Sequence, residues 1–131
     1  MMLKVTPDKE RAKSILGMIK QREKFINNIN GNKFSTILAE NYYEIIKELC
    51  TAIALTEGYK FIGENAHKEL IDFMKNYNMG EDQLVIMNDL RIRRNKSSYE
   101  GKPIEQIYLH NKKADLLIII KKLKDVLGDK R

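Results

Sequence analysis

Residues 35–59 read STILAENYYEIIKELCTAIALTEGY, and the apolar side chains of this stretch decide the fold. They recur every three or four positions, which is the spacing that places side chains on one face of an α-helix. The apolar arc is wider than a helix needs when one of its sides faces water. Its members are Leu38, Tyr42, Ile45, Ile46, Leu49, Cys50, Ala52 and Ile53. We therefore predict a central helix covered on several sides by other helices.

The flanking segments show the same helical spacing. A first helix is expected to start at Thr6-Pro7-Asp8, where a hydroxyl can cap the helix and proline suits its first position. It should end at the turn-forming residues 27–32. Asn65 can cap a third helix, and Glu81 begins a fourth with an acidic first turn.

A last helix is expected after the break at residues 101–103. The apolar run at residues 116–120, taken alone, could also be a buried strand. No hairpin dipeptide and no second alternating segment offers it a partner strand. The chain is therefore predicted to be all-α, an antiparallel bundle of four to five helices that forms a single domain over residues 1–131.

Composition limits the classes of function. The 131 residues are 43% hydrophobic and 32% charged, as in one globular domain, and the formal charge of +6 favours anionic partners such as nucleic acid. The single cysteine, Cys50, cannot form an internal disulfide, and no Cys/His spacing fits zinc. We expect no metal and no cofactor. Without a signal peptide or an apolar run of membrane-spanning length, we expect a cytoplasmic protein that does not enter the membrane.

The fourth helix runs into an arginine cluster, RIRRNKSSYEG at residues 91–101. Guanidinium groups are planar, permanently charged and suited to phosphate. Arg94 continues the apolar stripe of Met87 and Leu90, so its charge should lie at a buried margin and require an acidic or anionic partner. Glu44 and Glu48 are candidate counter-ions, or alternatively paired carboxylates for proton transfer. The run can also be a solvated helix end with cations at the negative pole of the helix dipole.

A second apolar face of this helix points away from Arg94. It consists of Leu84, Val85, Asn88, Ile92, Asn95 and Tyr99. A small bundle buries only one face of such a helix within one subunit, so we predict a homodimer through this region. Arg94 and Tyr99 are about 140° apart on an ideal helix. For them to meet, the helix must unwind at residues 95–98 or a two-fold axis must bring two subunits together.

At these residues the chain resembles the HEPN superfamily of small helical-bundle proteins. The signature of this family is an arginine, often followed by asparagine, with a histidine four to six residues later. Arg94-Asn95 matches the first half, whereas Tyr99 stands where the histidine would be. The resemblance extends over residues 35–127, including Tyr43-Glu44 and Ala66-His67-Lys68.

The resemblance implies a dimer in which arginine and histidine residues of both subunits meet in a cleft. Many members are metal-independent endoribonucleases of toxin–antitoxin or defence systems, and others accompany a small nucleotidyltransferase. Carried over to this chain, Arg94 would bind the scissile phosphate, and Asn95 would orient it or hold the helix end. Arg91 and Lys96 would lie at the rim of the site.

Tyr99 cannot simply take the role of the histidine. A phenol has an unperturbed pKa of about 10, so at neutral pH it donates hydrogen bonds and is a poor base. A tyrosine can still stack on a base and donate to phosphate, so Tyr99 could help to position a ligand. We therefore expect a dimer that binds RNA or nucleotide in a basic cleft between its subunits, with weak or no cleavage. Two alternatives stay open: an active ribonuclease in which His67 or a carboxylate replaces the histidine, and a protein-interaction module that partners a nucleotidyltransferase. Tyr99 can also be an amphipathic side chain with a purely packing role.

Overall fold

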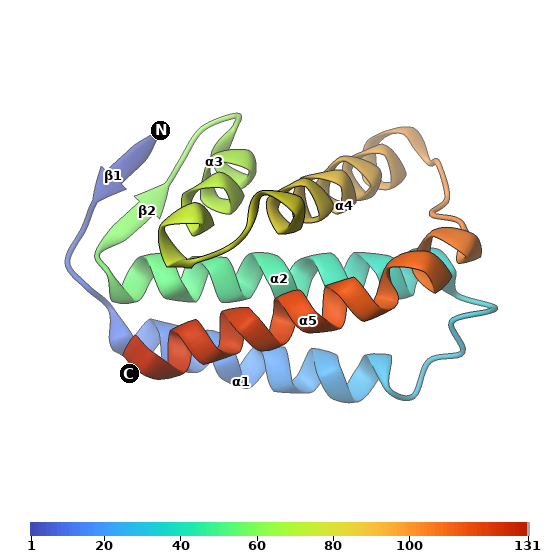
Figure 1. Cartoon of the computed structure of the whole chain (residues 1–131), viewed down its shortest axis with the longest axis horizontal. Helices are drawn as coiled ribbons and strands as arrows, with labels where there is room; N and C mark the ends of the chain where they lie inside the picture. Colours follow the sequence, from blue (N-terminus) through green and yellow to red (C-terminus); the bar gives the residue numbers. More distant parts are fainter. Residues whose placement is uncertain (131) are drawn as a thin grey trace.

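The structure, a computed structural model, is a bundle of helices around one central helix, with a small two-stranded sheet at one end (Figure 1). It describes the backbone of residues 1–130 and the side chains of residues 1–128. In chain order the elements are β1 (Met2–Lys4), α1 (Lys9–Ile26), α2 (Ser35–Thr56), β2 (Tyr59–Phe61), α3 (Ala66–Phe73), the 3-10 helix η1 (Met74–Tyr77), α4 (Glu81–Glu100) and α5 (Gln106–Lys130). The predicted helical bundle is confirmed.

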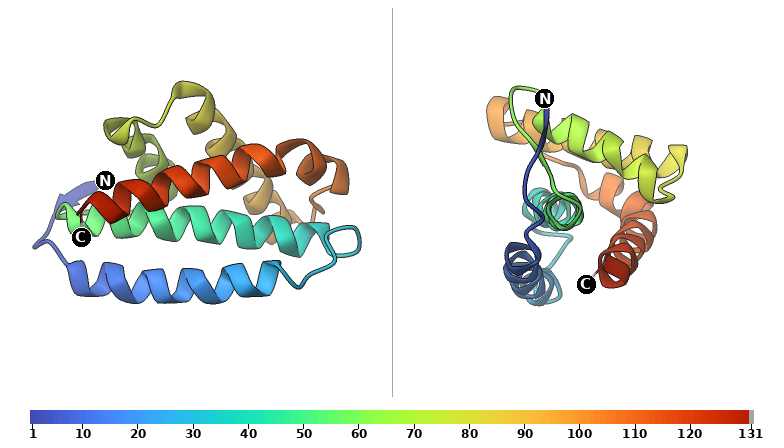
Figure 2. Two further views of the ribbon diagram at one scale, coloured as in Figure 1. Left: turned by 60° about the horizontal axis from the view of Figure 1, so that its bottom comes forward. Right: turned by 90° about the vertical axis from the view of Figure 1, so that its left-hand side faces the viewer.

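Helix α2 is the centre of the bundle, as its wide apolar arc predicts. It contacts α1, α5, α4 and α3. Viewed along its axis, α1, α5 and the α3–α4 pair lie on different sides of it (Figure 2). Every member of the predicted arc is buried, and so is Tyr43, which the prediction did not include.

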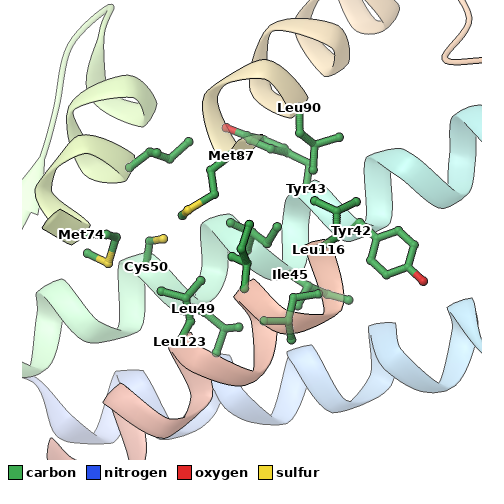
Figure 3. Packing of buried hydrophobic residues seen from close by; sticks show 14 of the residues in the cluster. Tyr42, Tyr43, Ile45, Leu49, Cys50, Met74, Met87, Leu90, Leu116 and Leu123 are labelled. Carbon is green, nitrogen blue, oxygen red and sulfur yellow. The ribbon is translucent and has the colours of Figure 1, made fainter. Parts of the chain in front are cut away.

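The core forms where α4 and α5 meet α2. Met87 and Leu90 of α4 lie on the side of α2 that carries Tyr43, while Leu116 and Leu123 of α5 approach α2 from another side (Figure 3). All five side chains have no exposed surface. Burying one such apolar side chain contributes about 1.5–3 kcal/mol. These contacts fix the position of the middle of α4 against the middle of α2.

The ends of two helices differ from the prediction. α1 begins at Lys9 rather than near Thr6, because Asp8 is the N-cap and its carboxylate accepts a hydrogen bond from the Arg11 N–H at 3.0 Å. α2 stops at Thr56 rather than Tyr59. Gly58 there adopts φ +82°, which a right-handed helix cannot contain. Residues 116–120 are helical, as the wider context indicated.

The two-stranded sheet corrects the all-α prediction. β1 pairs antiparallel with β2 in the register Met2↔Phe61, Leu3↔Lys60 and Lys4↔Tyr59. The Val5 N–H then donates to the Gly58 carbonyl at 2.8 Å, which ties the start of the chain to the end of α2. Both strands are short and distant in sequence, so no local pattern marks them. Within residues 1–128, no helix is long and apolar enough to span a membrane.

Candidate functional site

Arg94 lies where the inner face of α4 reaches the edge of the core. It follows Met87 and Leu90, which are fully buried, and its own side chain is 23% exposed. One of its terminal nitrogens, Nη2, donates to Glu44 Oε1 on α2 at 3.1 Å. Arg94 therefore sits at a buried margin with an acidic partner, and Glu44 is that partner.

The Tyr43 ring lies next to the Arg94 guanidinium. The Arg94 Cζ lies 5.5 Å from the centroid of the Tyr43 ring, within the range of a cation–π contact. The Tyr43 hydroxyl is 3.3 Å from His67 Nδ1 at the start of α3. Burial, reinforced by the Glu44 carboxylate against the opposing effect of Arg94, raises the pKa of Tyr43 to about 12. This phenol is therefore neutral at physiological pH.

His67 is the titratable group next to this pair. Burial lowers its pKa below the ordinary 6.5, and the positive charges of Lys47 and Arg94 lower it further. The imidazole is therefore neutral at pH 7, with one nitrogen available as an acceptor. Tyr43 thus contacts both residues, His67 through its hydroxyl and Arg94 through its ring.

Lys47 shares the carboxylate that pairs with Arg94. Its Nζ lies 2.7 Å from Glu44 Oε2, so the two oxygens of Glu44 face two different cations. Arg91, on the neighbouring face of α4, donates to Asn88 Oδ1 at 3.2 Å. One carboxylate between Arg94 and Lys47 leaves a net positive charge, and this favours an anion at the margin.

The structure separates the other predicted residues from Arg94. α4 stays helical through Glu100, so of the two ways for Arg94 and Tyr99 to meet, unwinding at residues 95–98 does not occur. Tyr99 is 80% exposed on the outer face of the helix, and Lys96 is also exposed. Asn95 is half-buried and forms no side-chain hydrogen bond within the described residues. A single subunit therefore does not assemble Arg94, Asn95 and Tyr99 around one atom.

Glu48 belongs to a different contact. It accepts from Arg22 Nε of α1 at 2.8 Å, and its Oε2 is buried without a hydrogen-bond partner in the described structure. Both Glu44 and Glu48 are thus paired with cations, which is the arrangement of ion pairs and not of a proton-transfer dyad. Within the side chains that the structure describes, no group of three or more His, Cys, Asp or Glu residues could hold a metal ion.

Sequence reasoning missed two residues of the Arg94 site, Tyr43 and Lys47. Lys47 is three positions after Glu44, and this helical spacing could have identified the pair. Tyr43 precedes Ile46 by three positions and Cys50 by seven, so the spacing of the apolar arc could have included it, although it could not show the contact with Arg94. Its role depends on the position of α3 and α4 over α2.

No protein-family model, curated protein or solved structure matches this chain.

Proposed function

We propose that this protein binds RNA or nucleotide through Arg94, as a HEPN-like protein with weak or no cleavage. The observation that carries the proposal is the shared carboxylate: Glu44 lies 3.1 Å from Arg94 and 2.7 Å from Lys47. A structural ion pair would need one cation. The guanidinium has five N–H donors, of which the contact with Glu44 occupies one, so others remain for phosphate oxygens.

A second basic surface can continue the path of a bound strand. Lys96 and Lys102 line a pocket where α4 turns toward α5, and its third cation, Arg93, faces the one carboxylate of the lining, Asp89. Asp89 is already paired with Arg93 at 2.9 Å. Lys96 and Lys102 are both exposed, and although Lys102 lies 4.0 Å from the Glu100 carboxylate, the two supply positive charge that suits the phosphate backbone.

We also propose that α4 forms a homodimer through its outer face. Val85, Ile92 and Tyr99 follow one another at seven-residue intervals and are 63%, 43% and 80% exposed. Apolar residues at this spacing form a seam that a second helix can cover. A two-fold axis at Ile92 would place Tyr99 against the partner's Val85.

Such a dimer leaves the Arg94 site within one subunit. Arg94 is about 200° around the helix from Ile92, so the two Arg94 side chains would face away from the seam. The proposal of one cleft shared by both subunits would need a different interface. We therefore place phosphate binding among α2, α3 and α4 of a single subunit.

Binding of a labelled single-stranded RNA to Arg94→Ala tests the RNA proposal. We expect a loss of about tenfold or more, because a hydrogen bond to a charged group contributes about 1.5–3 kcal/mol. Arg93→Ala is the matched control, since Arg93 is a neighbouring arginine paired with Asp89 instead of Glu44. Affinity of Arg94→Ala equal to that of Arg93→Ala, with both variants folded, would reject the proposal.

One observation favours an active ribonuclease as the second candidate. His67 is neutral at pH 7, and its Nδ1 lies within hydrogen-bond distance of the Tyr43 hydroxyl. The Tyr43 ring in turn contacts the Arg94 guanidinium. A neutral imidazole can accept the proton of a ribose 2′-hydroxyl. Incubating the protein with mixed RNA in the presence of a chelator distinguishes a ribonuclease from a protein that only binds RNA. Cleavage that Arg94→Ala and His67→Gln both abolish would establish the enzyme. Intact RNA at high protein concentration would reject it.

A further inference from the structure

A second site lies beside the Arg94 site, between α1, the C-terminal half of α2, β2 and α3. It is a pocket of about 280 Å³. Its lining combines apolar or aromatic side chains with basic ones and includes no carboxylate and no side-chain amide. The lining residues are Arg11, Lys47, Thr51, Ala54, Leu55, Tyr59, Lys60, Phe61, Ala66, His67 and Leu70.

The basic residues of this pocket are incompletely neutralised. Lys47 is paired with Glu44, but Arg11 and Lys60 form no side-chain ion pair within the described residues. Both are exposed. The pocket therefore presents positive charge to any molecule that enters it, and a negatively charged group is the complement.

The neutral polar residues of the wall are Thr51, Tyr59 and His67. The Thr51 hydroxyl donates to the Lys47 carbonyl at 2.9 Å, so its proton is used within α2. Amide and carboxylate side chains, which read the edge of a nucleobase, are absent from the lining. The wall thus suits a ligand whose charged group only accepts hydrogen bonds and whose remainder is apolar.

We infer that this pocket binds a small organic anion, with a carboxylate or phosphate near Lys60 and Arg11 and a ring or short chain against the apolar wall. The volume of about 280 Å³ is just below the usual range of ligand pockets, about 300–1,000 Å³, and excludes long acyl chains. Arg94 does not line the pocket. The site is therefore additional to the proposed RNA site, although Lys47 and His67 border both.

Titration of the full chain with benzoate and with phenyl phosphate, followed by amide NMR shifts, tests this inference. We expect saturable binding with the largest shifts in β2 and at the start of α3. The stronger of the two probes identifies the preferred head group. Benzamide, which has the same ring without the charge, should bind about tenfold more weakly or worse.

Variants locate the site and separate it from RNA binding. Lys60→Glu should weaken the anionic probes about tenfold, because it reverses a charge at the pocket. Lys75→Glu, an exposed lysine of η1 outside the pocket, should change affinity less than about twofold, and so should Arg94→Gln. Ala66→Phe should block binding by filling the pocket while retaining a native amide spectrum.

Three results would overturn the inference. They are the absence of saturable shifts at millimolar probe, equal binding of benzamide and benzoate, and equal affinity of folded Lys60→Glu and Lys75→Glu. Loss of probe binding in Arg94→Gln would also contradict it, because the pocket would then not be separate from the RNA site. Failure of RNA binding alone would leave the probe titration unaffected.

Discussion

The two faces of α4 carry apolar residues at similar spacing but end in different environments. On the inner face, Met87 and Leu90 are fully buried against α2, and Arg94 is tied to Glu44. On the outer face, Val85 and Ile92 stay 63% and 43% exposed. The comparison shows that helical periodicity indicates which apolar residues share a face of the helix. Whether that face is buried within one subunit depends on the elements that pack against it.

The largest difference between the faces should appear in stability. Leu90→Ala removes a fully buried side chain and should lower the free energy of unfolding by about 2–5 kcal/mol. Ile92→Ala, at a side chain 43% exposed, should cost less than about 1 kcal/mol in the monomer. Urea denaturation measures both. Equal losses would show that the outer face is also packed within the subunit.

A charged substitution on the outer face of α4 should weaken the proposed dimer. Ile92→Glu places a carboxylate at the centre of the proposed seam and should weaken the dimer about tenfold or more, because a buried unpaired charge is costly. Sedimentation over a range of protein concentrations measures this. Met18→Glu, at an exposed methionine of α1, is the control and should leave assembly unchanged. A wild-type protein that remains monomeric would refute the seam.

A substitution beside Arg94 on the inner face of α4 should change the affinity for RNA. Glu44→Gln removes the charge shared by Arg94 and Lys47, so stability should fall by about 1 kcal/mol while RNA affinity rises several-fold. Glu48→Gln is the control, because Glu48 pairs with Arg22 and should affect stability without improving RNA binding. RNA affinity that falls in Glu44→Gln would mean that the carboxylate positions Arg94 for its ligand.

The smallest expected effect is that of pH on His67. Its pKa is lowered in the fold, so the unfolded chain binds the proton first, and stability should decline as pH falls below the ordinary value of 6.5. Once protonated, His67 adds positive charge, and RNA affinity should rise over the same range. His67→Gln should reduce both dependences, whereas His110→Gln, at an exposed site on α5, should not. Identical pH profiles for wild type and His67→Gln would exclude this role.

Much of the fold could be predicted from the sequence because the helices carry their own patterns. The wide arc of α2 predicted a central position, and α2 is surrounded by other helices. The pairing of β1 with β2 could not be predicted, because it joins segments far apart in the chain that have no alternating pattern. The end of α2 was misplaced for a related reason, since Gly58 leaves the helical conformation where it bonds to Val5.

The site was predictable in part. The stripe of Met87 and Leu90 indicated that Arg94 lies at a buried margin, and a carboxylate of α2 was among the expected partners. Choosing Glu44 over Glu48 required the rotation of α2 relative to α1, because Arg22 of α1 takes Glu48. The contact between Tyr43 and His67 depends on how α3 lies over α2, which local spacing does not encode.

The salt dependence of RNA binding tests most directly whether Arg94 binds phosphate. We predict that Arg94→Gln weakens binding of single-stranded RNA and reduces the slope of log affinity against log salt by about 0.7 for each phosphate that the variant no longer neutralises. Arg93→Gln should retain an affinity and slope much closer to those of the wild type. Wild-type affinity and slope in folded Arg94→Gln would contradict the proposal that this arginine holds the phosphate.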